Sequence, residues 1–462
     1  MSKVRKPAVS GTFYPNNEEE LDQMLNVFFN QAFELESTPK AIIAPHAGYV
    51  YSGSVAASAY KVLEKLKNKI NKIILFGPSH RVAFDGLAFP SSDYFETPLG
   101  KVKIDQKTIK KLEKFEQVII SDKAHENEHS LEVHLPFLQK IFGNKFELIP
   151  AVIGHSNPDK VAEILEELWG DDKSLIIIST DLSHYHTYEE AYEIDKETCR
   201  DVRNLNFENL YPEKMCGSLP VSGLLNLARK KDLKVRLVDF SNSGDTEIAN
   251  VPIDKNRVVG YASFYVGKEK DLGYFMAKSH KKELLRIARR VITESIENNY
   301  QPPEYLDSAF YFEEGNSATF VTLEIDGKLR GCIGSLEAHR HIIEDVAFNA
   351  FSAAFLDPRF TKLTKDELDK TEISISILTK PQPLEFKDEK DLLKKIRPKI
   401  DGLILIEGKK RGTFLPSVWK DLPKKEDFLN HLKNKAGLPE NYWSNKIKIQ
   451  RYITDKFSET DF

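Results

Sequence analysis

The stretch SLIIISTDLSHY (174–185) decides the fold, because a continuous apolar run leads directly into Asp181 and His184. A strand that is apolar at every position is buried on both faces, which is typical of a parallel sheet covered by helices. Amphipathic stretches between such runs, for example 54–67 and 159–169, suit βαβ crossovers. Similar runs before residue 267 are AIIA (41–44), KIILFG (72–77), FELIPAVIG (146–154), KVRLVDF (234–240) and RVVGYASFYV (257–266). The sequence therefore predicts an α/β fold, a mostly parallel sheet with helices on both faces.

A different pattern follows the charged link VGKEKDLG (266–273). A long amphipathic helix is predicted at 280–299, and then a hairpin whose Asp326-Gly327 pair suits a two-residue turn. The later predicted elements are a helix at 341–355, a strand at 372–379, a hairpin at 402–416, a helix at 424–436 and a strand at 446–453. This order is typical of an α+β domain with antiparallel strands. We therefore expect two domains, residues 1–267 and 270–462.

The composition is that of a soluble globular protein, with 462 residues, 41% hydrophobic and 29% charged. A formal net charge of −4 provides no overall attraction to nucleic acid or anionic lipid. The chain contains no apolar run of about 18 residues, and its start, MSKVRKPAVSGTFYP, lacks the apolar core of a signal peptide. We therefore expect a cytoplasmic protein without nucleic-acid or membrane partners, and homo-oligomer formation stays open.

Histidines follow several of the predicted strands at their carboxyl ends. AIIA leads to His46, KIILFG to His80, IPAVIG to His155 and SLIIIST to His184. Loops at the carboxyl ends of parallel strands meet at one edge of the sheet, where ligands bind. Imidazole is a common ligand of divalent transition metals. The sequence therefore predicts a metal site at this edge.

The segment HENEH (125–129) has the H-E-x-x-H spacing of zinc proteases, in which one helix face carries both histidines. Here the segment follows the polar SDKA, and the periodic apolar pattern begins only at Leu131. Pro136 is compatible only with the first turn of the helix that follows. We therefore interpret HENEH as a loop and helix entry, with His125 at the surface. A zinc hydrolase remains an alternative function.

Two groups of ordered motifs resemble known families. The N-terminal half resembles the Memo family, which shares its fold with the non-haem-iron class III extradiol dioxygenases. The second half resembles the AMMECR family. The N-terminal motifs are RKPAVSGTFYP, IIAPHAGYVYSG, LFGPSHRV, ETPLGKVKID, NEHSLEVHLPF, STDLSHY and MCGSLPVSGLL, and the C-terminal motifs are LRGCIGSLEA (329–338), LDPRF (356–360), TFLPSVW (413–419) and KIQRY (448–452). The genomic association of both families with a radical-SAM protein implies such a partner for this chain.

The resemblance to the Memo family implies a metal site at His46, His80 and Cys216, with Asp181 and His184 lining the same pocket. It also implies that His129, Glu132 and His134 lie near the pocket. The extradiol dioxygenases use a carboxylate where this chain has Cys216. A thiolate makes the site softer, so that copper(I) or zinc suits it as well as iron(II), the metal expected first.

These residues lead to two hypotheses for the function. In the first, the chain is a mononuclear metal-dependent redox enzyme, with dioxygenase-like activity on a small substrate. His184 then acts as acid or base, Asp181 binds the metal or orients His184, and His129 and His134 donate hydrogen bonds to oxygen or substrate. In the second, the cleft is a vestigial enzyme site, and the chain is a scaffold that binds a metal or a peptide.

The C-terminal domain offers Arg330 and Cys332 in LRGCIGS, with Arg359 in the nearby LDPRF motif. Glycines beside a thiol and an arginine allow the backbone to approach a ligand. The alternative interpretation is a tightly packed, glycine-dependent strand with a buried thiol.

Overall fold

The computed structural model describes residues 2–246, 253–273, 275–302 and 315–462. The chain divides into two compact units, Met1–Ser279 and His280–Phe462, and each is described by itself. Within the described ranges, the helices are all too short or too polar to cross a membrane.

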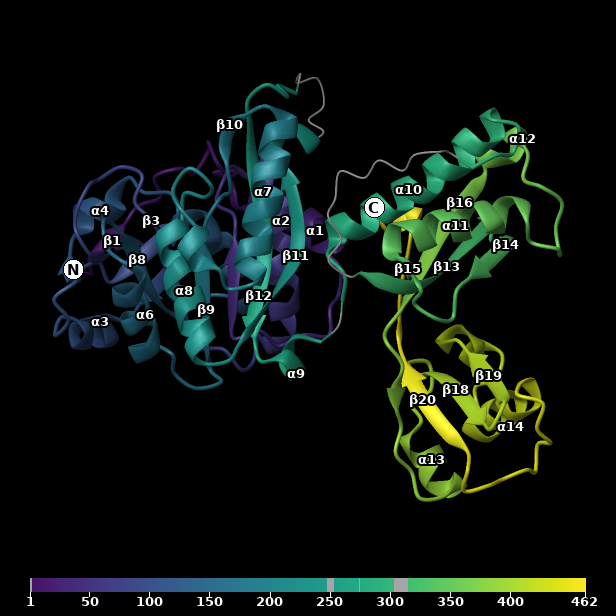
Figure 1. The fold of residues 1–462 in the computed structure, drawn as a ribbon. Helices are drawn as coiled ribbons and strands as arrows, with labels where there is room; N and C mark the ends of the chain where they lie inside the picture. The colour runs from purple at the N-terminus through teal and green to yellow at the C-terminus, as the bar shows by residue number, and fades with distance from the viewer. Residues whose placement is uncertain (1, 247–252, 274, 303–314) are drawn as a thin grey trace. The chain divides into compact units, whose positions relative to one another are not determined.

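The first unit is built on a large mixed sheet (Figure 1). Its four central strands run parallel to one another in the order β8 (Glu147–Ile153), β3 (Lys72–Pro78), β9 (Ser174–Ser179) and β2 (Ala41–Ala44). Beyond β2, the sheet continues with β12 (Val258–Gly267) and β11 (Lys234–Asn242), both in antiparallel pairing. The remaining strands are β1 (Val4–Arg5), β4 (Leu87–Phe89), β5 (Tyr94–Thr97), β6 (Gly100–Ile104), β7 (Val118–Ile120) and β10 (His184–His186). The predicted mostly parallel sheet is confirmed at its centre. Antiparallel pairs lie on both sides of it, β4 with β8 and β5 with β6 on one side and β12 with β2 on the other.

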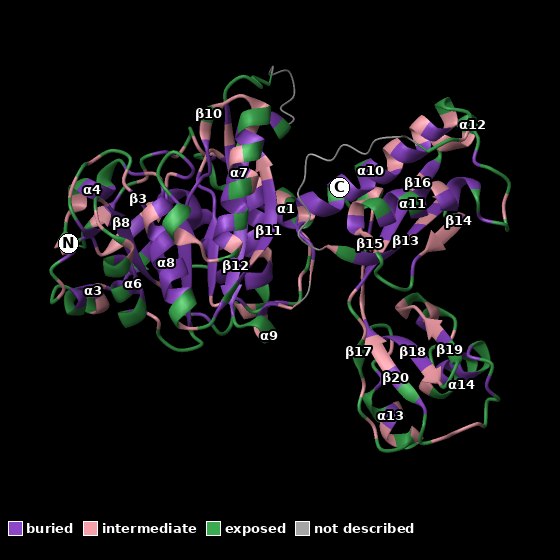
Figure 2. Cartoon of the chain, viewed as in Figure 1, coloured by how far each residue is buried: buried purple, intermediate pink, exposed green. Residues whose placement is uncertain are grey.

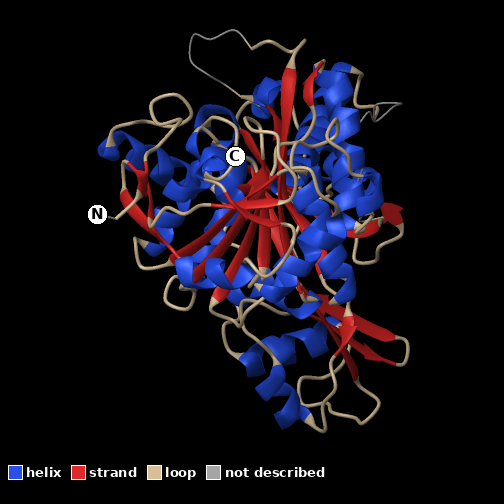
Figure 3. Ribbon diagram, turned by 90° about the vertical axis from the view of Figure 1, so that its left-hand side faces the viewer, coloured by secondary structure: helices blue, strands red, loops and turns tan. Residues whose placement is uncertain are grey.

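Helices cover both faces of this sheet (Figure 1; Figure 3). One face carries α6 (Pro158–Glu167), α7 (Tyr188–Arg203) and α8 (Ser218–Lys230), and the other carries α1 (Glu18–Gln31), α2 (Tyr49–Tyr60) and α5 (Leu135–Phe142). The shorter helices are α3 (Gln106–Leu112), α4 (Asp122–Glu126) and α9 (Glu269–Leu272). Gly223 allows α8 to lie close to α6, because a Cβ there would be 2.4 Å from Val161 Cγ1.

The central strands form the core of the first unit, and Figure 2 shows them buried beneath helices whose outer faces are exposed. Every residue of β2 and β9 is buried, as the continuous apolar runs predicted. Burial on both faces holds the strand ends in place, and therefore the loops that follow them.

The second unit contains two antiparallel sheets, which confirms the predicted α+β organisation. The first joins β14 (Lys328–Gly334), β13 (Asn316–Ile325), β16 (Thr371–Leu378) and β21 (Thr454–Ser458), with β15 (Arg340–His341) beside β13. The second joins β17 (Gln382–Pro383), β20 (Lys448–Tyr452), β18 (Gly402–Glu407) and β19 (Lys410–Phe414). Its helices are α10 (Lys278–Glu297), α11 (Ile342–Phe355), α12 (Lys365–Leu368), α13 (Glu389–Lys395) and α14 (Lys425–Lys435).

The first predicted hairpin and the final predicted strand of the second unit can be compared with the structure. The Asp326-Gly327 turn has φ values of +51° and +70°, as a two-residue hairpin turn requires. The prediction stopped at one final strand, whereas the structure has β20 followed directly by β21. The two strands belong to different sheets, so an unbroken run of β-type residues changes partners at Ile453.

Candidate metal centre

A cavity of about 590 Å³ lies at the carboxyl ends of the central strands. His46 follows β2, His80 follows β3 and Asp181 follows β9, so three neighbouring parallel strands deliver side chains to it. His129 and His184 line the same cavity. A volume of this size accommodates a small molecule, as in other ligand sites.

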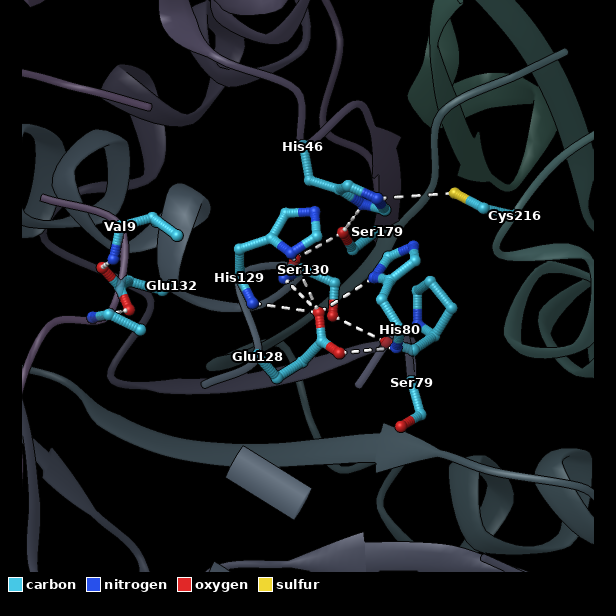
Figure 4. A network of polar contacts seen from close by, with 12 residues as sticks. Val9, His46, Ser79, His80, Glu128, His129, Ser130, Glu132, Ser179 and Cys216 are labelled. Carbon is cyan, nitrogen blue, oxygen red and sulfur yellow. Dashed lines mark hydrogen bonds and ion pairs between the residues drawn. The ribbon is translucent and has the colours of Figure 1, made fainter. Parts of the chain in front are cut away.

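Three potential metal ligands converge beside this cavity (Figure 4). The ligand atoms of His46, His80 and Cys216 all lie within 4.8 Å of one another. The distance from His46 Nε2 to Cys216 Sγ is 3.4 Å, and the Asp181 backbone N–H donates to the same sulfur at 3.2 Å. Burial, together with nearby Asp181, raises the pKa of the Cys216 thiol to about 12. The thiol is therefore protonated at neutral pH unless a cation binds to it.

Glu128 orients His80. Its Oε1 accepts a hydrogen bond from His80 Nδ1 at 2.9 Å, and its Oε2 accepts from the His80 backbone N–H at 2.6 Å. Burial alone would raise the pKa of Glu128, but the hydrogen bonds from His80 lower it to about 2. An ionised carboxylate only accepts hydrogen bonds, so His80 carries its proton on Nδ1 and has a lone pair on Nε2. A carboxylate bonded to the second nitrogen is the usual support of a metal-binding histidine.

A hydrogen-bond chain orients His46 from behind. Ser179 Oγ donates to the Ser130 carbonyl at 2.6 Å and contacts His46 Nδ1 at 2.5 Å and His134 Nε2 at 2.8 Å. A hydroxyl has one proton, so both imidazole nitrogens must donate to Ser179. His134 Nδ1 then accepts from the Tyr60 hydroxyl at 2.8 Å. His46 is thus protonated on Nδ1, and its Nε2 lone pair is directed toward Cys216.

Three further residues in the cavity could act on a ligand. Nδ1 of His129 is buried without a hydrogen bond from the described residues, because the nearest oxygen, Glu128 Oε1 at 3.3 Å, already has three donors. Burial lowers the pKa of His129 to about 4 and that of His184 below its usual range. Burial raises the pKa of Asp181 to about 7. At neutral pH both histidines are neutral, and the pKa of Asp181 lies near the pH of the medium.

Two predicted histidines lie outside this cavity. His134 is completely buried, and both of its ring nitrogens are occupied, so it supports His46 instead of donating to a substrate. His155 was predicted at the same edge, but it lines a second cavity of about 600 Å³, which Phe84 and Cys216 also line. The chain after β8 pairs with Asp85 through backbone hydrogen bonds, which turns His155 away from His46.

The HENEH segment does not form the zinc-protease arrangement. Helix α4 ends at Glu126, so His125 and His129 do not share one helix. Pro136 lies in the first turn of α5, as predicted. The expected surface position of His125 is wrong, since it is 2% exposed and its Nε2 contacts the Ala88 carbonyl at 2.9 Å. The apolar strand β4 covers it, which the local sequence does not indicate.

Sequence reasoning missed Glu128, Ser179 and Tyr60 as supports of the site. Glu128 lies inside HENEH, but the zinc-protease motif assigns the functional role to Glu126, the glutamate after the first histidine. Ser179 offered a weak signal, since it is a polar residue at the end of an otherwise apolar strand. Glu132 was expected near the pocket, and the structure places it behind the cavity wall, where it accepts from Arg5 and Tyr14.

The candidate site residues of the second unit, Arg330, Cys332 and Arg359, lie close together. Arg359 donates to the Cys332 carbonyl at 3.0 Å and to Asp357 at 2.7 Å, while Arg330 donates to Glu367 at 2.8 Å. Cys332 Sγ accepts from Thr322 Oγ1 at 3.3 Å. A Cβ at Gly331 would lie 2.1 Å from the Ala353 carbonyl oxygen, so the glycine allows β14 to contact α11. These contacts agree with tight, glycine-dependent packing, but the Cys332 thiol of that alternative is only half-buried.

The hydrogen-bond chain behind His46 leads to a prediction. Changing Ser179→Ala removes the acceptor that selects the Nδ1 proton of His46, so transition-metal affinity should fall about 10- to 100-fold. The effect is measured by zinc titration against a competing chelator. Ser183→Ala, another small change of a buried serine in the next loop, is the control and should leave the affinity within about twofold. Equal losses in the two variants would contradict this role of Ser179.

The fold and the cavity define an α/β protein with imidazole and thiol groups gathered at the carboxyl edge of its sheet. The chain belongs to the Memo-like protein family, whose model matches residues 5–265, and the AMMECR1 model matches residues 285–457.

Relatives of known sequence cover the first unit. A MEMO1 family protein of Aquifex aeolicus is 37% identical over 254 residues, which are 53% of this chain and 94% of the relative. MEMO1 family protein TV1383 of Thermoplasma volcanium is 34% identical over 268 residues, 56% of this chain and 97% of the relative. Among solved structures, uncharacterized protein PH0010 of Pyrococcus horikoshii matches at 30% identity, covering 39% of this chain and 92% of that one with a TM-score of 0.36.

Proposed function

We propose that the first unit binds one transition-metal ion, with iron expected first, and uses it in redox chemistry on a small substrate. The observation that carries this proposal is the convergence of His46, His80 and Cys216, whose ligand atoms lie within 4.8 Å of one another. The other ring nitrogen of each histidine is held by Glu128 or Ser179. Such support of the second ring nitrogen is typical of metal-binding histidines.

The donor set also indicates which metals are suitable. Two imidazoles and one thiolate suit iron(II), copper(I) and zinc, whereas magnesium and calcium prefer oxygen ligands. When bound, such an ion would supply redox or Lewis-acid chemistry at the inner end of the cavity. His184 and His129 are neutral at working pH because burial lowers their pKa values, so either can accept a proton from a substrate. Asp181, with a pKa raised by burial to about 7, can hold or release one.

The test of this proposal is metal binding by a double variant. The protein is purified anaerobically, loaded with iron(II), copper(I) or zinc, and analysed for bound metal beside His46→Ala/Cys216→Ala. We expect about one ion per chain and a loss of affinity of at least about 100-fold in the variant, because two of the three ligands are gone. His339→Ala, at an exposed histidine of the second unit, is the control. Undiminished binding by the double variant would contradict the proposal.

Oxygen uptake distinguishes an enzyme from a scaffold. The metal-loaded protein is screened with catechols, other dihydroxy-aromatics and thiols. We propose the redox enzyme because His129 and His184 line the cavity in addition to the proposed ligands, and a cavity with surplus histidines is costly to keep for binding alone. Metal-dependent turnover supports this choice, whereas tight metal or peptide binding without turnover supports the scaffold.

A further inference from the structure

The outer part of the metal-site cavity contains two arginines, Arg81 and Arg257. In the described part of the chain, neither guanidinium group forms an ion pair or a hydrogen bond. Arginines elsewhere in the first unit do pair, for example Arg5 with Glu132 and Arg229 with Glu208. Both side chains are exposed and can be solvated by water, but two guanidinium groups that line one cavity also offer hydrogen-bond donors to an anionic ligand.

One carboxylate lines the same outer part. Asp254 accepts from the Asn256 backbone N–H at 2.9 Å and keeps its charge, so among the described lining residues the outer part has two cations and one anion. The cavity therefore presents a net positive outer part. Guanidinium groups in a partly enclosed site bind carboxylate or phosphate groups through paired hydrogen bonds.

Aromatic side chains line the same cavity. Phe13, Tyr51, Tyr185 and Tyr261 all face the cavity. Tyr185 has a φ of +65° and is 62% exposed, and Arg257 Cζ lies 4.3 Å from the centre of its ring. A left-handed backbone at a tyrosine is costly, and such strain is often kept at binding sites. The pairing of His184 with Val259 holds this conformation, so that His184 and Tyr185 both line the cavity.

We propose that the substrate of this cavity is a small planar acid. Its anionic group binds to the outer arginines, its ring contacts the aromatic side chains, and its other end reaches His46 and His80. Arg81 follows His80 directly in the chain, so the anion contact and the inner histidines belong to one loop. A cavity of about 590 Å³ has room for one such molecule. This inference rests on the proposed function, because it names the class of molecule that the metal-site cavity accepts.

The test compares ligands of one shape that differ in charge. Binding of 4-hydroxybenzoate and 4-hydroxybenzamide to the full chain is measured by calorimetry, with and without zinc, at low salt. We expect the acid to bind about tenfold more tightly than the amide, since charged hydrogen bonds are about twice as strong as neutral ones. Arg81→Gln and Arg257→Gln should each reduce this preference. Arg200→Gln, on α7 and outside the cavity, is the matched control and should retain it.

A third probe, 4-hydroxyphenyl phosphate, identifies the anion. Tighter binding than the benzoate, lost in the same variants, would assign the arginines to a phosphate instead of a carboxylate. Equal affinity for acid and amide, a preference that survives in both arginine variants, or no binding of either anion at millimolar concentration would overturn the inference. Normal metal binding alongside these results would leave the proposed function intact, whereas absent metal binding would overturn that proposal by itself.

Discussion

The metal affinity of the first unit should rise about tenfold for each pH unit above about pH 7.5. The reason is Cys216, whose pKa burial and Asp181 raise to about 12, so the thiol must lose a proton when a metal binds. His46 adds no proton, because burial lowers its pKa well below the usual range and it is already neutral. Raising the pH removes the competing proton and therefore strengthens binding.

Below about pH 7 the dependence should become steeper, because Asp181 has a pKa of about 7 and a bound cation also favours its ionised form. Zinc titrations against a chelator at several pH values measure the slope, and a pH indicator counts the protons released. Cys216→Ala should bind more weakly and lose the slope above about pH 7.5. A variant that keeps the wild-type slope would exclude Cys216 as the source of the proton.

Replacing Glu132→Gln should destabilise the first unit by about 3–5 kcal/mol, because the change leaves the Arg5 cation buried without its partner. Arg5 Nη1 lies 2.5 Å from Glu132 Oε2, and the two side chains are 6% and 0% exposed. The same carboxylate accepts from the backbone N–H groups of Ala8 and Val9 and from the Tyr14 hydroxyl. It therefore holds the N-terminal segment that carries Phe13 to the cavity wall.

Urea unfolding measures the global loss, and hydrogen exchange in peptides covering residues 4–15 measures the local one. Glu96→Gln is the control, because its partner Lys6 is 73% exposed and such a surface pair contributes at most about 1 kcal/mol. If the two variants lose the same stability, Glu132 is not the anchor of this segment. Loss of Phe13 from the wall should also speed exchange at His129, whose ring centre lies 4.8 Å from that of Phe13.

Much of the fold follows from local patterns. The all-apolar runs predicted β2, β3, β8 and β9, since only strands covered on both faces lack polar positions. The same logic placed His46, His80, Asp181 and His184 at one edge, because parallel strands end together. The same reasoning misplaced His155. The chain after β8 pairs with the loop at Asp85, which is distant in the sequence, and this pairing sets the position of His155. Cys216 was predicted as a metal ligand only from the family resemblance, since a single cysteine before a helix does not by itself indicate a metal site.

The sequence by itself determined the two-domain organisation, the parallel core and the group of histidines at its carboxyl edge, because strand period and strand polarity are local properties of the chain. Only the tertiary structure decided which nitrogen of each histidine is free. Glu128 supports His80, and Ser179 with His134 supports His46, through contacts between residues 45 to 133 positions apart. Such contacts depend on how buried strands and loops pack, and no spacing within a single motif encodes them.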